Sequence, residues 1–151
     1  MNILFVCTGN TCRSPMAEAL LKHFSDGTMN VRSVGIFASE GSPASQQSIQ
    51  VLKEEGVELN HSSKPLTKDS MDWADLILTM TEGHKHAILS QFPTRKDDVF
   101  TLKEHVSEDD QSEPSLSSKD VSDPFGGPVD IYRQTFDELQ ALIRKLQKKY
   151  S

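Results

Sequence analysis

A short apolar run near the start of the chain passes directly into a small polar loop and then into a helix. Residues 3–6 have the length and composition of a buried strand, and Pro15 suits the first position of a helix. Between them lie residues 7–14, with the sequence Cys-Thr-Gly-Asn-Thr-Cys-Arg-Ser. This strand–loop–helix unit favours folds in which a buried strand is followed at once by a helix that covers it.

The rest of the chain continues the same alternation of apolar runs and one-sided helices. We expect strands at residues 2–6, 31–34, 74–80 and 99–102, and helices at residues 15–24, 44–55, 82–91 and 128–149. This pattern predicts a single domain over residues 1–151, of the α/β class, with a doubly wound four-stranded parallel sheet flanked by helices. In such sheets ligands bind beyond the carboxyl ends of the strands, which is where the loop at residues 7–14 lies.

Local details follow from the same pattern. Ser14 is expected to cap the first helix, and Ile49 to face the core from the second. Residues 107–122 are rich in Ser, Asp, Glu and Lys, and predict a long surface loop. His84 and His86 lie two positions apart on a short helix and are expected to be solvated.

Composition excludes several classes of partner. The net charge of −6 argues against nucleic acid or an anionic membrane, because both require a basic face. No apolar run approaches the length of a membrane span, and the start of the chain lacks the basic region of a signal peptide. We therefore expect a cytoplasmic protein, with a monomer as the default. The five histidines show no metal-ligand spacing, so no metal or cofactor is expected.

The loop at residues 7–14 has the parts needed to hold a phosphate and attack its phosphorus. Backbone N–H groups in a tight turn at a helix N-terminus converge on an anion, and Gly9 and Asn10 tolerate the required backbone angles. Arg13 presents a planar fork that matches two phosphate oxygens. The same positive field favours the thiolate of Cys7, which Ser14 can hydrogen-bond. A cysteine that only packs in the core, the alternative, leaves these accompanying residues unexplained.

A leaving group also needs a proton, and Asp123 is the candidate donor. It ends the polar segment, and Pro124 biases its backbone toward an extended form. An Asp-Pro pair is also a common turn, so the presence of the cysteine loop in the same chain favours the catalytic interpretation.

Together these motifs resemble the low-molecular-weight protein-tyrosine-phosphatase family. The matching residues are 7–15 (CTGNTCRSP) and 123–126 (DPFG), with further matches at 33–35 (SVG), 74–80 (ADLILTM) and 99–104 (VFTLKE). Within that family the chain is most similar to the bacterial protein-arginine phosphatases. The resemblance spans essentially the whole chain, and it implies a four-stranded parallel sheet, no metal and a two-step reaction.

The resemblance also implies roles for the motif residues. Cys7 attacks phosphorus to give a cysteinyl-phosphate while Asp123 protonates the leaving group, and water then hydrolyses the intermediate with Asp123 as base. Arg13 and the loop amides stabilise the equatorial oxygens. The expected substrate-binding residues are Thr8, Gly9, Asn10, Thr11, Cys12, Ser14, Phe37 and Phe125.

Substrate choice is expected to depend on residue 11. Tyrosine-directed members of the family usually carry a bulky aliphatic residue there and aromatic residues just after Asp-Pro, whereas this chain has Thr11 and the sequence Phe-Gly-Gly at residues 125–127. Thr11 can accommodate a planar phosphoguanidinium group, Asp123 can accept one of its hydrogen bonds, and Phe37 and Phe125 can pack against it. Arginine-phosphorylated proteins are therefore the expected partners, with tyrosine-phosphorylated proteins as the alternative.

The second cysteine suggests redox regulation. Once Cys7 is oxidised to sulfenic acid, Cys12 can capture it as a reversible disulfide; the alternative is that Cys12 is a small shielded residue. Two further functions rank lower. An arsenate reductase needs additional cysteines to relay a disulfide, and a non-catalytic phosphate-binding module does not need a nucleophile, an arginine and an acid together.

Overall fold

The computed structural model describes residues 1–59, 61–107 and 119–150. Its centre is a sheet of four strands, β1 (Asn2–Cys7), β2 (Asn30–Gly35), β3 (Leu76–Thr79) and β4 (Val99–Thr101). The strands lie in the order β2-β1-β3-β4, and every neighbouring pair is parallel. The predicted four-stranded parallel sheet is therefore confirmed.

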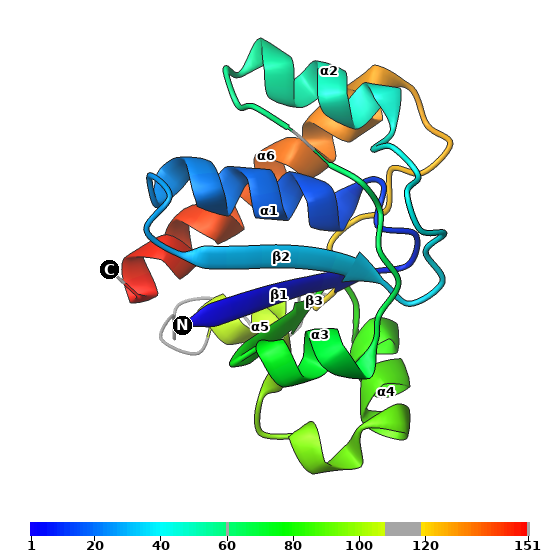
Figure 1. Ribbon diagram of the computed structural model, residues 1–151. Coiled ribbons are helices and arrows are strands. Elements are labelled where there is room, and N and C mark those ends of the chain that lie inside the picture. Colours follow the sequence, from blue (N-terminus) through cyan, green and yellow to red (C-terminus); the bar gives the residue numbers. More distant parts are fainter. Residues whose placement is uncertain (60, 108–118, 151) are drawn as a thin grey trace.

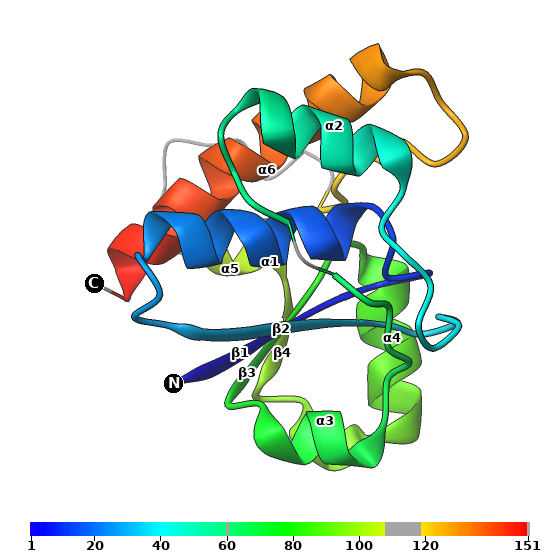
Figure 2. The same ribbon diagram turned by 45° about the horizontal axis from the view of Figure 1, so that its top comes forward.

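Helices cover both faces of the sheet (Figures 1 and 2). They are α1 (Arg13–Phe24), α2 (Gln46–Glu54), α3 (Lys68–Trp73), α4 (Glu82–Gln91), α5 (Leu102–Ser107) and α6 (Val129–Lys149), with a 3-10 turn at Pro93–Arg95. One face carries α1 and α6, with α2 packed on α6, and the other carries α3 and α4. The sequence pattern did not predict α3 and α5, because each has only six residues and no full amphipathic repeat. None of the described helices is long and apolar enough to cross a membrane.

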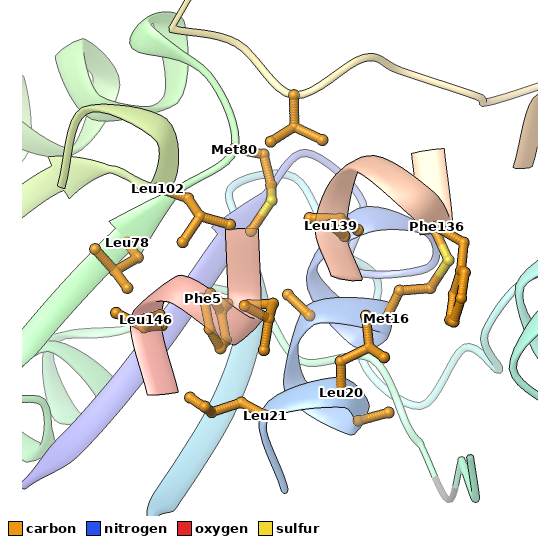
Figure 3. Packing of buried hydrophobic residues seen from close by; sticks show 14 of the residues in the cluster. Phe5, Met16, Leu20, Leu21, Leu78, Met80, Leu102, Phe136, Leu139 and Leu146 are labelled. Atoms are coloured by element: carbon orange, nitrogen blue, oxygen red, sulfur yellow. The ribbon is translucent and has the colours of Figure 1, made fainter. Parts of the chain in front are cut away.

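The central strand β1 is buried on both faces, which explains its unbroken apolar sequence. Ile3 and Phe5 belong to the cluster formed with α1 and α6, whereas Leu4 and Val6 belong to the cluster formed with α3 and α4. Figure 3 shows Phe5 among the apolar side chains that α1 and α6 contribute. Because both faces are filled by packing, only the ends of the strand are open for chemistry.

Several local expectations were wrong. Ser14 lies inside α1 and does not cap it; the capping position is Cys12, whose side chain makes no capping hydrogen bond. Ile49 is 41% exposed, and α2 instead buries Val51 and Leu52, on the side where it packs on α6. Of the predicted surface loop at 107–122, residues 108–118 lie outside the described residues, whereas Val121 is buried.

Candidate active site

The loop between β1 and α1 surrounds the sulfur of Cys7 with hydrogen-bond donors. The Asn10 backbone N–H donates to Cys7 Sγ at 3.3 Å, and Ser14 Oγ lies 2.8 Å from the same sulfur. Asn10 Nδ2 donates to Ser14 Oγ at 2.8 Å, which leaves the Ser14 hydroxyl hydrogen free to donate to Cys7. Two hydrogen-bond donors therefore face the sulfur, the atom that would act as a nucleophile.

The turn of this loop is held from behind by Asn10. Its φ angle of 56° lies in the left-handed region, which agrees with the expectation from sequence. His61 Nε2 and Ser63 Oγ each donate to the Asn10 carbonyl oxygen at 2.7 Å, and the Lys64 N–H donates to Asn10 Oδ1 at 3.0 Å. Asn10 is fully buried under these contacts. It therefore shapes the loop from beneath rather than facing a ligand with its side chain.

Close approach of β2 to the loop requires a glycine at position 35. A Cβ atom there would lie 2.6 Å from the Thr8 carbonyl oxygen and 2.7 Å from the Asn10 nitrogen. The Phe37 N–H donates to that same Thr8 carbonyl oxygen at 2.9 Å. The end of β2 thus acts as a wall for the loop, a role that the sequence motif alone did not indicate.

Arg13 joins this loop to the segment that carries Asp123. Its guanidinium NH1 donates to the Val121 carbonyl oxygen at 3.1 Å, and its NH2 lies 3.6 Å from Asp123 Oδ2. Arg13 is buried, whereas Asp123 is exposed and accepts a hydrogen bond from the Phe125 N–H at 3.0 Å. The carboxylate therefore stands at the mouth of the site, close to the charge that would hold a phosphate.

The segment before Asp123 is anchored to the rest of the fold at several points. Asp120 Oδ1 accepts from the Glu82 N–H at 2.8 Å, at the first turn of α4, and the Val121 N–H donates to the Met80 carbonyl oxygen at 2.7 Å. Ser122 Oγ donates to Glu138 Oε2 of α6 at 2.8 Å. These contacts set the position of Asp123 through tertiary structure.

The loop after β1 and the segment that carries Asp123 meet at one cavity of about 250 Å³. The cavity is lined by Cys7, Thr8, Gly9, Thr11, Cys12, Arg13, Asp123 and Phe125. Phe125 is 78% exposed at its mouth. Phe37 is 83% exposed and is not among the lining residues, and Asn10 and Ser14 are buried beneath the loop. No cluster of His, Cys, Asp and Glu side chains within residues 1–59, 61–107 and 119–150 could hold a metal ion.

Nearly the whole chain, residues 2–151, matches the family described as low molecular weight phosphotyrosine protein phosphatase. The chain belongs to this family. This phosphatase is 51% identical to the protein-arginine-phosphatase of Bacillus subtilis, over 99% of this chain and 96% of the relative. It is 37% identical to the low molecular weight protein-tyrosine-phosphatase PtpB of Staphylococcus epidermidis, over 99% of both chains.

A solved structure supports the same placement. The phosphatase superposes on a cysteine-to-serine mutant of the YwlE arginine phosphatase with a phosphorylated active-site serine, at a TM-score of 0.89. The two are 51% identical, and the match covers 99% of this chain and 95% of the other. In that protein the active-site position that carries a cysteine in the unmutated enzyme can therefore carry a phosphoryl group.

His84 of this phosphatase is buried beside the loop, so the expectation that it is solvated was wrong. Its Nε2 lies 2.8 Å from Thr8 Oγ1, and the residue is 8% exposed. Burial, followed by the charge of Arg13, lowers the pKa of His84 from 6.5 to about 4. Sequence spacing alone could not reveal this contact. The usable signal was that His84 follows strand 74–80, whose carboxyl end lies at the same sheet edge as the loop.

This lowered pKa predicts acid-sensitive stability in the phosphatase. Between pH 6.5 and about 4 the unfolded chain protonates His84 and the folded protein does not. The free energy of unfolding should therefore decrease as the pH falls through this window, by roughly 2 to 3 kcal/mol. Urea denaturation at pH 7 and pH 4.5 measures the difference. His84→Gln should lose this component, whereas His86→Gln, at an exposed position on the same helix, should keep it. An equal pH response in His84→Gln and wild type would contradict the assignment.

Cys12 lies among three hydroxyl groups on the other side of the cavity. Its Sγ lies 3.4 Å from Tyr132 Oη, 3.6 Å from Thr11 Oγ1 and 3.8 Å from Ser45 Oγ. Burial, together with the hydrogen bond to Cys12, raises the pKa of Tyr132 to about 12, so its hydroxyl stays protonated and can donate to sulfur. Tyr132 comes from α6, far along the chain from the loop, so no local pattern indicated this contact. Cys7 and Cys12 are both free and buried.

Proposed function

We propose that this protein removes phosphate from phosphoarginine side chains of proteins through a cysteinyl-phosphate intermediate. One observation carries the proposal: Cys7, Arg13 and Asp123 line a single cavity whose remaining wall includes the small polar side chain of Thr11. The 51% identity to a protein-arginine-phosphatase over nearly the full length of both chains supports the same substrate class.

In the first step the Cys7 thiolate attacks phosphorus as the bond between phosphorus and the guanidino nitrogen breaks. Asp123 donates its proton to the departing nitrogen, so the arginine side chain leaves protonated. Arg13 and the loop N–H groups hold the equatorial oxygens, where negative charge gathers in the transition state. In this proposal the buried Arg13 needs no movement to reach the phosphate, because Val121 already holds its guanidinium at the cavity.

In the second step water attacks the phosphorus of the cysteinyl-phosphate, and the Asp123 carboxylate takes the proton of that water. The bond between sulfur and phosphorus breaks, inorganic phosphate leaves, and Cys7 returns to the thiolate. Ser14, 2.8 Å from the sulfur, stabilises the leaving thiolate with its hydroxyl hydrogen. A single carboxyl group thus acts as acid and then as base, which its place at the cavity mouth allows.

The substrate side chain is proposed to enter past Phe125 and to meet Thr11. A phosphoguanidinium group is planar and carries several N–H donors, so it needs an acceptor more than an apolar wall. Thr11 Oγ1 and the carbonyl oxygen of the protonated Asp123 carboxyl group provide acceptors on the cavity surface, and the exposed ring of Phe125 offers a flat apolar face. Phe37, exposed on the neighbouring loop, is proposed to contact the polypeptide around the phosphorylated residue.

Thr11→Ile tests this substrate assignment. Isoleucine removes the acceptor and fills part of the cavity, so kcat/KM for a phosphoarginine peptide should fall by about 10-fold or more. Activity on the matching phosphotyrosine peptide should hold or rise. Thr94→Ile, an exposed change away from the cavity, is the matched control. A wild type that prefers phosphotyrosine would support the alternative of a protein-tyrosine phosphatase, as the PtpB relative is named. An unchanged preference in Thr11→Ile would show that Thr11 does not set the substrate choice.

We further propose that Cys12 protects Cys7 from irreversible oxidation. Peroxide converts the Cys7 thiolate to sulfenic acid, and the Cys12 sulfur then attacks the Cys7 sulfur, forms a disulfide and releases water. The Tyr132 hydroxyl, 3.4 Å from Cys12 Sγ and protonated, can donate a hydrogen bond to that sulfur.

Cys12→Ser tests whether Cys12 protects Cys7 by forming a disulfide or is only a small shielded residue. Peroxide should inactivate both wild type and Cys12→Ser, but a dithiol should restore most of the activity only in wild type, each compared with its own untreated enzyme. Mass spectrometry of wild type should find an internal disulfide before the dithiol is added. Equal recovery in the two proteins would show that Cys12 is not the resolving thiol.

A further inference from the structure

The first turn of α4 contacts both parts of the active site. His84 Nε2 lies 2.8 Å from Thr8 Oγ1 of the phosphate-binding loop. Two residues earlier, the Glu82 N–H donates to Asp120 Oδ1 at 2.8 Å, in the segment that leads to Asp123. One short helix therefore bridges the wall beside the nucleophile and the segment that carries the proposed acid.

His84 occupies this place at a cost in hydrogen bonding. It is 8% exposed, and within the described residues its Nδ1 atom has no hydrogen-bond partner. A buried polar atom without a partner is unfavourable, and an apolar side chain of similar size would avoid that penalty. Core packing alone therefore does not account for a histidine here, whereas the hydrogen bond between its ring Nε2 and Thr8 does.

A neutral ring suits this position electrostatically. Burial, the charge of Arg13 and the N-terminal end of α4 all oppose protonation, although Asp120 and Asp123 partly offset them, so His84 is neutral at pH 7. A lysine or arginine here would compete with Arg13 for the substrate phosphate. The neutral imidazole can fix a neighbour by one directional hydrogen bond without adding charge beside the anion site.

That neighbour, Thr8, directly follows Cys7. Its carbonyl oxygen accepts from the Phe37 N–H at 2.9 Å, and its hydroxyl is held by His84, so both its backbone and its side chain are anchored. Thr8 is exposed and lines the cavity. Loss of the His84 contact would free the cavity wall next to the nucleophile while leaving the Asn10 contacts behind the loop intact.

We propose that His84 is a positioning residue of this phosphatase, which acts on catalysis by holding Thr8 through the Nε2–Oγ1 hydrogen bond. The inference deepens the proposed function and rests on it in one respect, that the loop at residues 7–14 binds the phosphoryl group. It assigns no chemistry to the imidazole itself.

A double-mutant cycle tests the proposal. His84→Leu and Thr8→Val should each lower kcat/KM by about 5- to 10-fold, the range expected for one hydrogen bond. The double variant should lose no more than either single variant, because both remove the same contact. Thr8→Ser and His84→Gln, which keep hydrogen-bonding groups, should recover most of the activity. His86→Leu, at an exposed position on the same helix, should match wild type.

The assays use p-nitrophenyl phosphate and a phosphoarginine peptide in parallel, with the thermal unfolding midpoint of every variant. Losses that multiply in the double variant, or wild-type activity in His84→Leu, would overturn the proposal. If His84→Leu does not fold, equal activity of Thr8→Val and Thr8→Ser would overturn it instead. A wild type that hydrolyses p-nitrophenyl phosphate but not phosphoarginine would reject the proposed substrate while the cycle still decides the role of His84.

Discussion

Replacing Cys7 with serine is expected to lower kcat by at least about 10⁴-fold while leaving oxyanion binding within a few-fold of wild type. Serine nearly preserves the shape of the side chain, but its hydroxyl is not ionised at neutral pH and is a far weaker nucleophile. Arg13 and the loop backbone are unchanged, so the anion site stays intact. The separation of turnover from binding is the property that identifies Cys7 as a nucleophile.

The measurement pairs steady-state hydrolysis with calorimetric binding of tungstate, an oxyanion that is not turned over. Cys12→Ser is the matched control, because it makes the same substitution five positions away at another residue that lines the cavity. A Cys7→Ser variant that retains turnover within about 100-fold would contradict a covalent intermediate. A variant that loses tungstate binding as well would show that the cysteine chiefly maintains the loop.

Asp123→Asn should lower kcat for a phosphoarginine peptide by about 10² to 10⁴-fold, the usual contribution of a general acid. The amide cannot donate a carboxyl proton, yet its oxygen can still accept the hydrogen bond that the Phe125 N–H now gives to Asp123 Oδ1. The loss should be smaller for p-nitrophenyl phosphate, whose leaving group departs readily without a proton. This dependence on the leaving group distinguishes an acid from a residue that only binds substrate.

Asp120→Asn provides the control for Asp123. It makes the same chemical change in the same segment, at a carboxylate that accepts from the Glu82 N–H and does not line the cavity. Its effect on kcat should be much smaller and equal for the two substrates. If the two variants lose equal activity, or if Asp123→Asn affects both substrates alike, the acid role of Asp123 is wrong.

The strongest local patterns were sufficient to predict the main elements. The helices predicted at 82–91 and 128–149 match α4 and α6 to within one residue, because α4 begins at the capping residue Thr81 and α6 carries a one-sided apolar repeat. Ile49 was wrong because one turn of a short helix can bury either of two adjacent faces, and the neighbouring helix decides which. Ser14 was expected both to cap the helix and to hydrogen-bond Cys7. The cap was wrong, because the helix begins at Arg13, one residue before Ser14, whereas the Ser14 hydroxyl does lie 2.8 Å from the Cys7 sulfur.

Local sequence was sufficient to indicate the chemistry proposed for the loop, because the proposed nucleophile, the arginine and the turn-forming residues are contiguous and their spacing is covalent. It also determined the parallel sheet, through the alternation of buried strands and helices. The surroundings of that loop, by contrast, depend on how distant segments pack together. The strand order β2-β1-β3-β4 places the ends of β2 and β3 on either side of β1, which brings Gly35 and His84 against the loop. The anchoring of Val121 then brings Asp123 to Arg13 from the far end of the chain, by contacts between segments that no local pattern encodes.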